Sequence, residues 1–169
     1  MTDPATDAAA AGFRLAVGQF ASGVVVVTTS GGQAAAVSAF ASVSLEPPLV
    51  LFCAAKTSPF HDAVLAAGEW AVSILADDAE PTACWLTTSS PPSGAQLDGI
   101  PHYPAPVTGA PLLAGALATL ECRTDAVHDG GDHTIIIGRV LAASTPNAAA
   151  AGTPLLRYVG AYRRLRPLD

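Results

Sequence analysis

Short apolar segments of strand length, separated by glycine and proline, constrain the fold of this chain more than any other feature. Val24–Thr29 is a β-branched run that ends at a Ser-Gly-Gly turn, and Ala116–Val127 alternates between small apolar and charged residues. Alternation of this kind predicts a half-buried strand with one face on a core. The inward face would carry Ala118, Leu120 and Cys122, and the solvent face would carry Glu121, Arg123 and Asp125.

Strands therefore outnumber helices in the expected structure. The other expected strands are Ala34–Leu45, Leu49–Cys53, Trp70–Leu75, Thr134–Ala142, Leu155–Tyr158 and Tyr162–Leu165. Hairpin turns between neighbours, as at His128–Gly131, favour a mainly antiparallel barrel with a few short peripheral helices. A Rossmann fold is excluded, because the chain has neither a GxGxxG motif nor a regular alternation of strands and helices.

Few segments have helical character. One short helix is expected over residues 11–20, and a second begins where Ser58 caps Pro59 and ends at Gly68. A third opens at Asp77 or Asp78 and runs toward Leu86. Residues 87–111 are rich in Ser, Thr, Pro and Gly, which predicts a long loop. We expect residues 1–9 to be a disordered leader and residues 10–169 to form a single domain.

Composition narrows the function classes. The chain has 169 residues, a net charge of −6 and only 13% charged residues, which argues against nucleic acid as a partner. No apolar run reaches the roughly 18 residues of a membrane span, so a cytoplasmic protein is expected. The low charge suggests an apolar surface covered by a second subunit. The three cysteines form no CxxC pair, so neither a metal site nor a disulfide framework is predicted.

Two short segments have the residue types that could bind a ligand: one suits a phosphate, and the other suits a flat ring. Lys56-Thr57-Ser58 puts the only lysine of the chain beside a helix N-terminus, where free N–H groups favour an anion. Ser38–Ser44 alternates small and hydroxylated residues, so a flat heteroaromatic ligand could lie against its backbone. An ordinary capped helix and a polar edge strand are the alternative interpretations of these segments.

A third segment, His128–His133, places two histidines and two acids around a double glycine. Gly130-Gly131 permits a tight turn and close approach of a ligand, and His133 could point into a cleft. A polar hairpin without a ligand is the alternative interpretation. No GxSxG, P-loop or HExxH motif is present, so none of these common catalytic motifs is indicated.

Taken in order, these motifs resemble the flavin reductase family with the FMN-binding split barrel, over about Phe13 to Leu165. Members of that family are the small reductase components of two-component flavin-dependent monooxygenases. The matching blocks are Gly18–Thr29, Ser38–Val50, Lys56–Ser58, Trp70–Leu75, Pro111–Leu113, Gly131–Val140, Pro154–Leu156 and Gly160–Tyr162.

The resemblance implies a Greek-key split barrel, a reaction and a set of site residues. The reaction would be NAD(P)H-dependent reduction of FMN or FAD, with NADH or NADPH as the hydride donor and a partner monooxygenase as the acceptor of reduced flavin. A homodimer is the expected assembly. The flavin ring and ribityl chain would lie on Ala36, Val37, Ser38, Ser42, Val43, Ser44, Cys53 and Ala54.

The same resemblance assigns the remaining roles. Lys56 and Ser58 would bind the flavin phosphate, and Asp132, His133 and Tyr158 would bind the nicotinamide. His133 is the candidate catalytic residue, and it would orient the dinucleotide rather than donate a proton. The chain departs from the family at two places: Ala34 and Ala36 stand where the family has Gly-x-Thr, and Gln96-Leu97 replaces a basic residue followed by Phe.

Three other functions remain open at this point. A flavin carrier without reductase activity would not need the Asp132-His133 turn. A flavin oxidase of the pyridoxamine-phosphate type would need more basic residues than a single lysine and the scattered arginines. A purely structural barrel would bind no flavin at all.

Overall fold

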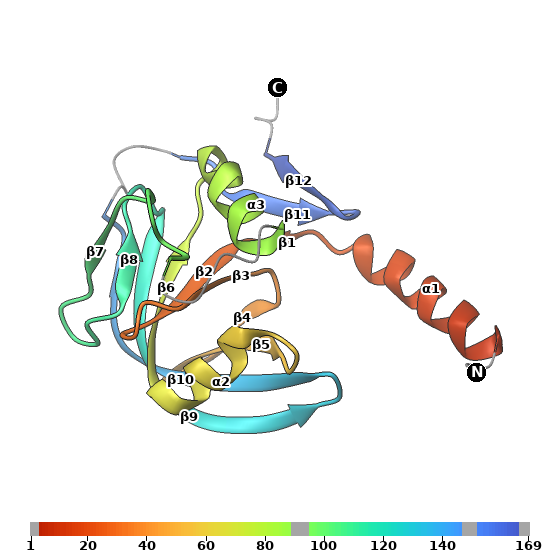
Figure 1. The fold of residues 1–169 in the computed structure, drawn as a ribbon, viewed down its shortest axis with the longest axis horizontal. Helices are drawn as coiled ribbons and strands as arrows, with labels where there is room; N and C mark the ends of the chain where they lie inside the picture. The colour runs from red at the N-terminus through yellow and green to blue at the C-terminus, as the bar shows by residue number, and fades with distance from the viewer. Residues whose placement is uncertain (1–3, 89–94, 147–151, 166–169) are drawn as a thin grey trace.

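A seven-stranded antiparallel sheet forms the body of the molecule (Figure 1). The computed structural model describes residues 4–88, 95–146 and 152–165. The strand order is β3-β2-β6-β9-β10-β5-β4, and all neighbours pair antiparallel. Their bounds are β2 Val25–Thr29, β3 Ala34–Val37, β4 Phe40–Leu45, β5 Pro48–Ala55, β6 Glu69–Ile74, β9 Ala118–Gly130 and β10 His133–Ser144. The expected mainly β, antiparallel fold is confirmed.

The two edge strands of this sheet, β3 and β4, are consecutive in the sequence. Only Ser38 and Ala39 join them, so the sheet has to curl until its edges approach each other. The Cys53 N–H donates a hydrogen bond to the Ala39 carbonyl at 3.1 Å, which continues the β4–β5 ladder into this link. The single strand expected over Ala34–Leu45 is therefore wrong, because the link at Ser38-Ala39 transfers the chain from one edge to the other.

Buried β-branched and aromatic residues hold the curled sheet together. The ring of Phe52 packs edge-on against Trp70, with 4.9 Å between ring centroids and 76° between planes. Residues of β2 alternate between two core clusters, Val25 and Val27 in one and Val26 in the other. Both faces of β2 are thus covered, which explains why this segment is apolar throughout rather than alternating.

Two helices pack against the sheet, and the first helix projects from the body (Figure 1). The helical elements are α1 Pro4–Gly18, α2 Pro59–Ala67, the 3₁₀ turn η1 Asp77–Ala79 and α3 Glu80–Thr88. The expected start of α2 is confirmed: Ser58 Oγ accepts from the Phe60 N–H at 3.2 Å, and Gly68 ends the helix at φ 66°. Helix α1 begins within the segment expected as a leader, since its alanines are strong helix formers. No helix in the described part of the chain has the length and apolar character to cross a membrane.

Two small sheets complete the fold. One has the order β1-β11-β12, formed by Ser22–Gly23, Leu155–Tyr158 and Ala161–Arg164. The other is the hairpin of β7, His102–Pro104, and β8, Pro111–Leu113. The loop expected over residues 87–111 is thus partly wrong, since it contains β7 and the start of β8; residues 89–94 lie outside the described part.

Two further expectations from the sequence are corrected by the structure. Glu121 is only 3% exposed, because residues 105–110 cover the face of β9 that should meet solvent. The turn between β9 and β10 lies at Gly131-Asp132 rather than over His128–Gly131, with Gly131 at φ 78°.

Candidate functional site

A cleft of about 230 Å³ lies where the curled edges of the sheet approach the start of α2. It brings together residues of β3, of the Ser38-Ala39 link, of the end of β5 and of the β9–β10 turn. Seven of the site residues predicted from the sequence line it: Ala36, Val37, Ser38, Cys53, Ala54, Ser58 and His133. The cleft is also lined by Ala35, Ala39, Ala55 and Phe60. These side chains are apolar, so no motif for ligand binding could identify them in the sequence.

The edge of β3 that faces away from β2 turns backbone groups toward this region. The Thr29 N–H donates to the Gln33 carbonyl at 3.0 Å, which sets the phase of the β2–β3 ladder. In an antiparallel ladder, hydrogen-bonded pairs alternate with pairs that are not hydrogen bonded. Counting from the bonded pair Thr29–Gln33, Ala34 and Ala36 belong to the second kind, so their backbone groups point away from β2. The Ala34 N–H accordingly donates to Gln96 Oε1 at 3.1 Å. The backbone N–H and carbonyl of Ala36 face the same open edge, where a planar ligand could pair with them.

Two further clefts adjoin the first one. A groove of about 450 Å³ shares Ser38, Ala39 and Cys53 with it and carries Tyr158 on its wall. The Tyr158 hydroxyl donates to Gln19 Oε1 at 3.1 Å. A smaller cleft of about 210 Å³ shares Ala36, Val37 and Ser38. Ser38 borders all three, so the link between the sheet edges is the centre of the candidate site.

The other predicted ring contacts lie apart from these clefts. Ser42, Val43 and Ser44 belong to β4 and line none of the three. Ser42 and Val43 are exposed, and the pairing of β4 with β5 shifts register between Ser42 and Ser44. The structure thus does not bring them together with the residues of the 230 Å³ cleft.

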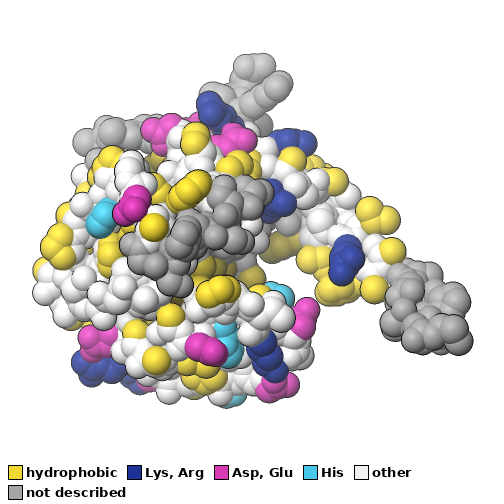
Figure 2. Space-filling view, in the orientation of Figure 1, with side chains coloured by type: hydrophobic (Ala, Val, Ile, Leu, Met, Phe, Trp, Pro, Cys, Tyr) yellow, Lys and Arg dark blue, Asp and Glu magenta, His cyan; other side chains and the backbone are white. Residues whose placement is uncertain are grey.

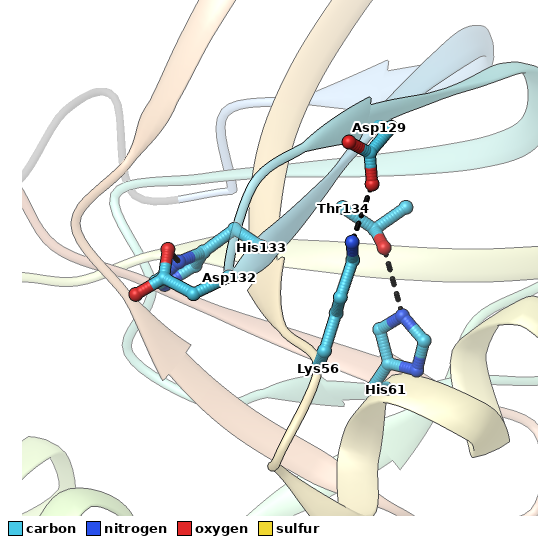
Figure 3. A network of polar contacts seen from close by, with 6 residues as sticks. All are labelled: Lys56, His61, Asp129, Asp132, His133 and Thr134. Carbon is cyan, nitrogen blue, oxygen red and sulfur yellow. Dashed lines mark hydrogen bonds and ion pairs between the residues drawn. The ribbon is translucent and has the colours of Figure 1, made fainter.

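The predicted phosphate ligands already have partners within the chain (Figure 3). Lys56 Nζ forms an ion pair with Asp129, and the Lys56 N–H donates to the Asp132 carbonyl at 3.0 Å. Ser58 Oγ caps the Phe60 N–H, as described above. The ion pair, in which Lys56 is 40% and Asp129 78% exposed, can exchange readily with solvent or an anion. A phosphate at Lys56 would have to share the ammonium group with Asp129 or displace it.

Carboxylates near the turn have lowered pKa values. The hydrogen bond from Lys56, and then the attraction of its charge, lowers the pKa of Asp129. His133 Nδ1 is hydrogen bonded to Asp132 Oδ1 at 2.7 Å, and this bond lowers the pKa of Asp132. The side chain of His133 is 43% exposed, so its ring can reach a ligand in the cleft that it lines.

A histidine that the sequence analysis did not select also lies in this network. His61 on α2 is hydrogen bonded through Nε2 to Thr134 Oγ1 at 2.8 Å (Figure 3). Its Nδ1 is hydrogen bonded to Asp62 Oδ1 at 2.7 Å. It fastens α2 to the start of β10, next to His133. The sequence shows that His61 lies in the first turn of the helix that begins at Ser58-Pro59. It does not reveal the partner of His61, because Thr134 is 73 residues away.

Cys53, another predicted cleft residue, is a half-buried free thiol. Burial raises the pKa of this thiol, so it stays neutral at ordinary pH and acts as a small apolar wall. Within residues 4–88, 95–146 and 152–165, no group of three or more His, Cys, Asp or Glu is arranged to hold a metal ion.

The architecture described above is that of solved flavin reductases. The Streptomyces globisporus C-1027 NADH:FAD oxidoreductase SgcE6 superposes with a TM-score of 0.87 and 36% sequence identity, covering 99% of this chain and 98% of that one. Residues 17–166 match the family described as "Flavin reductase like domain". The chain therefore belongs to the flavin reductase family, as its motifs suggested.

Curated relatives agree with this assignment. The chain is 39% identical over 158 residues to the reductase subunit HsaB of a flavin-dependent monooxygenase from Rhodococcus jostii, covering 92% of this chain and 77% of HsaB. It is 41% identical over 155 residues to SmoA, an FMN reductase (NADH) from Agrobacterium fabrum, covering 90% of this chain and 84% of SmoA. These names support the reductase hypothesis over a flavin carrier or a pyridoxamine-phosphate-type oxidase.

Proposed function

We propose that this protein is an NADH-dependent flavin reductase that reduces FMN or FAD and supplies the reduced flavin to a separate monooxygenase. The observation that carries the proposal is the gathering of seven predicted site residues around one cleft, in a chain whose residues 17–166 match the flavin reductase family. HsaB and SmoA are named for a monooxygenase partner and for NADH, respectively.

The residues of the cleft fit a flavin in three respects. Alanines at positions 35, 36, 39, 54 and 55 leave room for a flat ring close to the backbone. The free backbone N–H and carbonyl of Ala36 suit the donor and acceptor edge of such a ring. Lys56 offers a cation for the phosphate next to the capping residue Ser58. Bound flavin supplies the hydride acceptor, so the protein has to position two ligands and exclude water.

His133 is proposed to position the nicotinamide. Its bond to Asp132 fixes the ring orientation, and its place on the cleft wall sets it beside the predicted flavin contacts. Tyr158 lies on the adjoining 450 Å³ groove, which shares Ser38, Ala39 and Cys53 with the cleft. We propose that this groove admits the dinucleotide, with Tyr158 as a contact.

The finer description of the fold is also part of this proposal. The curled sheet, whose two edges are linked by Ser38-Ala39, is proposed to be a Greek-key split barrel. Residues 10–169 would form one domain around it. A cytoplasmic location follows the expectation from the sequence.

We further propose that the protein is a homodimer. Helix α1 projects from the body, and apolar side chains gather on it (Figures 1 and 2). Phe13 on α1 is 66% exposed and Phe20, just after its end, is 78% exposed, which is costly for a surface that remains in water. The outer part of β4 is also exposed at Val43 and Leu45. A second copy that covers both surfaces would bury them.

The activity is tested by mixing the purified protein with NADH or NADPH and with FMN, FAD or riboflavin in turn, and following the loss of nicotinamide absorbance. We expect turnover with NADH that depends on added flavin. Flavin binding without any NADH oxidation would instead identify a carrier, and no flavin binding at all would identify a structural barrel.

A substitution at His133 tests the nicotinamide site. His133→Ala should raise the KM for NADH and lower kcat/KM, because the ring positions the dinucleotide but takes no part in the hydride step. The Kd for flavin should change little. His128→Ala, at an exposed residue of the same hairpin that lines none of the clefts, is the matched control. A large loss of flavin affinity in His133→Ala would place this residue in the flavin site instead.

A further inference from the structure

A separate pocket of about 320 Å³ lies at the opposite end of the β9–β10 hairpin from His133. It is enclosed by the β7–β8 hairpin and by the last residues of β10, and its walls include Tyr103, Pro106, Leu112, Glu121 and Ala142. Strand β10 has 12 residues, so roughly 30 Å of strand separate this pocket from the nicotinamide turn. Its volume falls within the range of small-molecule sites, about 300–1,000 Å³.

Glu121 is the only acidic residue of this pocket among those described, and its carboxylate is held rigidly. The side chain is 3% exposed. Its Oε2 atom accepts three hydrogen bonds: from the Val107 N–H at 2.8 Å, from the Thr108 N–H at 2.7 Å and from Thr108 Oγ1 at 3.1 Å. Residues 107–108 therefore fix one oxygen and leave the carboxylate in a single orientation.

The other oxygen, Oε1, receives no hydrogen bond from any described residue. No fully buried side-chain oxygen in the described part of the chain lacks a partner, so Oε1 must be reachable from outside. The pocket is the opening that Glu121 lines. A fixed carboxylate oxygen thus lines a cavity whose other walls are largely apolar, where a donor that enters the cavity can complete its hydrogen bonding.

We propose that this pocket binds a small organic ammonium ion, with the ammonium group on Glu121 Oε1 and an apolar body against Leu112, Pro106 and Ala142. An N–H donor that carries positive charge makes the strongest hydrogen bond to a carboxylate. The net charge of −6 on the protein also favours the approach of a cation over that of an anion. Tyr103 on the wall suits an ammonium group as well, since aromatic rings attract cations. This site is independent of the proposed reductase activity.

The proposal is tested with three probes of similar size: benzylamine, which is a cation, benzyl alcohol, which is neutral, and benzoate, which is an anion. Each is titrated into the protein, and binding is followed by calorimetry and by amide chemical shifts. We expect benzylamine to bind at least tenfold more tightly than benzyl alcohol, with shifts at residues 103–121 and 142–144. Benzoate should not bind.

Two variants assign the effect to the pocket. Glu121→Gln keeps an oxygen for Val107 and Thr108 but removes the charge, and it should abolish the preference for benzylamine. Ala142 pairs directly across from Glu121, so Ala142→Leu should fill the pocket and block binding while the carboxylate stays intact. Glu69→Gln, at a glutamate that pairs with Arg123 outside the pocket, is the control and should bind benzylamine normally. Equal binding of amine and alcohol, or unchanged benzylamine binding in Ala142→Leu, would overturn the proposal, even if Glu121→Gln fails to fold.

Discussion

At the residue scale, Lys56 is the side chain whose role depends most on its partners. It is the only lysine of the chain, and it lies between the cleft at Ser58 and the turn that carries His133. Its ion pair with Asp129 and its N–H bond to Asp132 tie the start of α2 to that turn. A flavin phosphate and Asp129 would therefore compete for one ammonium group.

This competition predicts opposite effects of two substitutions. Lys56→Ala should weaken FMN binding by about 1–3 kcal/mol, the scale of a charge-assisted hydrogen bond. Asp129→Asn removes the competitor and should strengthen FMN binding modestly, by no more than severalfold. Riboflavin lacks the phosphate and should bind all three proteins alike, as measured by flavin fluorescence. Parallel losses for FMN and riboflavin in Lys56→Ala would remove Lys56 from the phosphate site.

The same pair makes a prediction about pH. Lys56 lowers the pKa of Asp129, first through the hydrogen bond and then through its charge. A depressed carboxyl pKa means that the stabilisation is present above the ordinary pKa and is lost as the pH falls through the lowered value. In an NMR titration, Lys56→Ala should therefore raise the pKa of the Asp129 carboxyl toward its ordinary value. If the pKa of Asp129 were unchanged in Lys56→Ala, the ion pair between the two side chains would be contradicted.

At the element scale, the close approach of β10 to β6 decides how the core packs. Gly138 on β10 lies over the Trp70 ring, and a Cβ at this position would stand 2.2 Å from Trp70 Cζ2 and 2.6 Å from Cη2. Trp70 has no room to retreat, because it is fully buried against Phe52 and its Nε1 donates to Thr124 Oγ1 at 3.1 Å. Only glycine permits this contact.

Gly138→Ala should accordingly lower the free energy of unfolding by about 1–3 kcal/mol, as overpacked cores do. The measurement is urea denaturation followed by Trp fluorescence and by circular dichroism. Gly23→Ala on β1, where a Cβ meets nothing within 4 Å, is the control and should leave stability nearly unchanged. Combining Gly138→Ala with Trp70→Phe should cost less than the sum of the two single changes, since the shared clash is relieved. Full additivity would show that the two residues do not collide.

Elements with a strong local pattern were predictable from the sequence, and elements set by long-range pairing were not. The Ser58-Pro59 start of α2 and its end at Gly68 depend on neighbouring residues alone, so both were found. The division of Ala34–Leu45 depends on where β2 and β5 lie, which no local pattern reveals. The burial of Glu121 depends on a hairpin within a segment whose composition indicated only a loop.

The candidate site also has a part that was predictable from the sequence and a part that was not. Ala36, Ser38, Cys53 and His133 come from three separate segments. Local patterns indicated Ser38 and His133, whereas only the resemblance to a known family indicated Ala36 and Cys53. The resemblance could not show that Lys56 has an internal partner, because Asp129 is 73 residues away and the pair forms only when the turn folds back. Nor could it show that the 230 Å³ cleft omits Ser42 and Ser44.

At the scale of the whole molecule, the end of α1 lies beside the candidate site. The 450 Å³ groove shared by Tyr158 and Ser38 is bordered by Val17 and Phe20 at the base of α1. Beyond this base, the helix extends away from the body (Figure 1). An apolar helix beside an open groove is what a subunit interface would use, which is why the proposed dimer bears on the site as well as on assembly.

A charge at Phe20, two residues after the end of this helix, therefore tests assembly directly. Phe20→Asp should convert a dimer into a monomer, because an aspartate buried in an apolar interface has no partner. Sedimentation equilibrium gives the mass of each variant over a range of concentrations. Val127→Asp, at a comparably apolar position that is 47% exposed on β9, is the matched control and should remain a dimer. If the unaltered protein sediments as a monomer, α1 has another occupant; if Phe20→Asp stays dimeric, the interface lies elsewhere on the molecule.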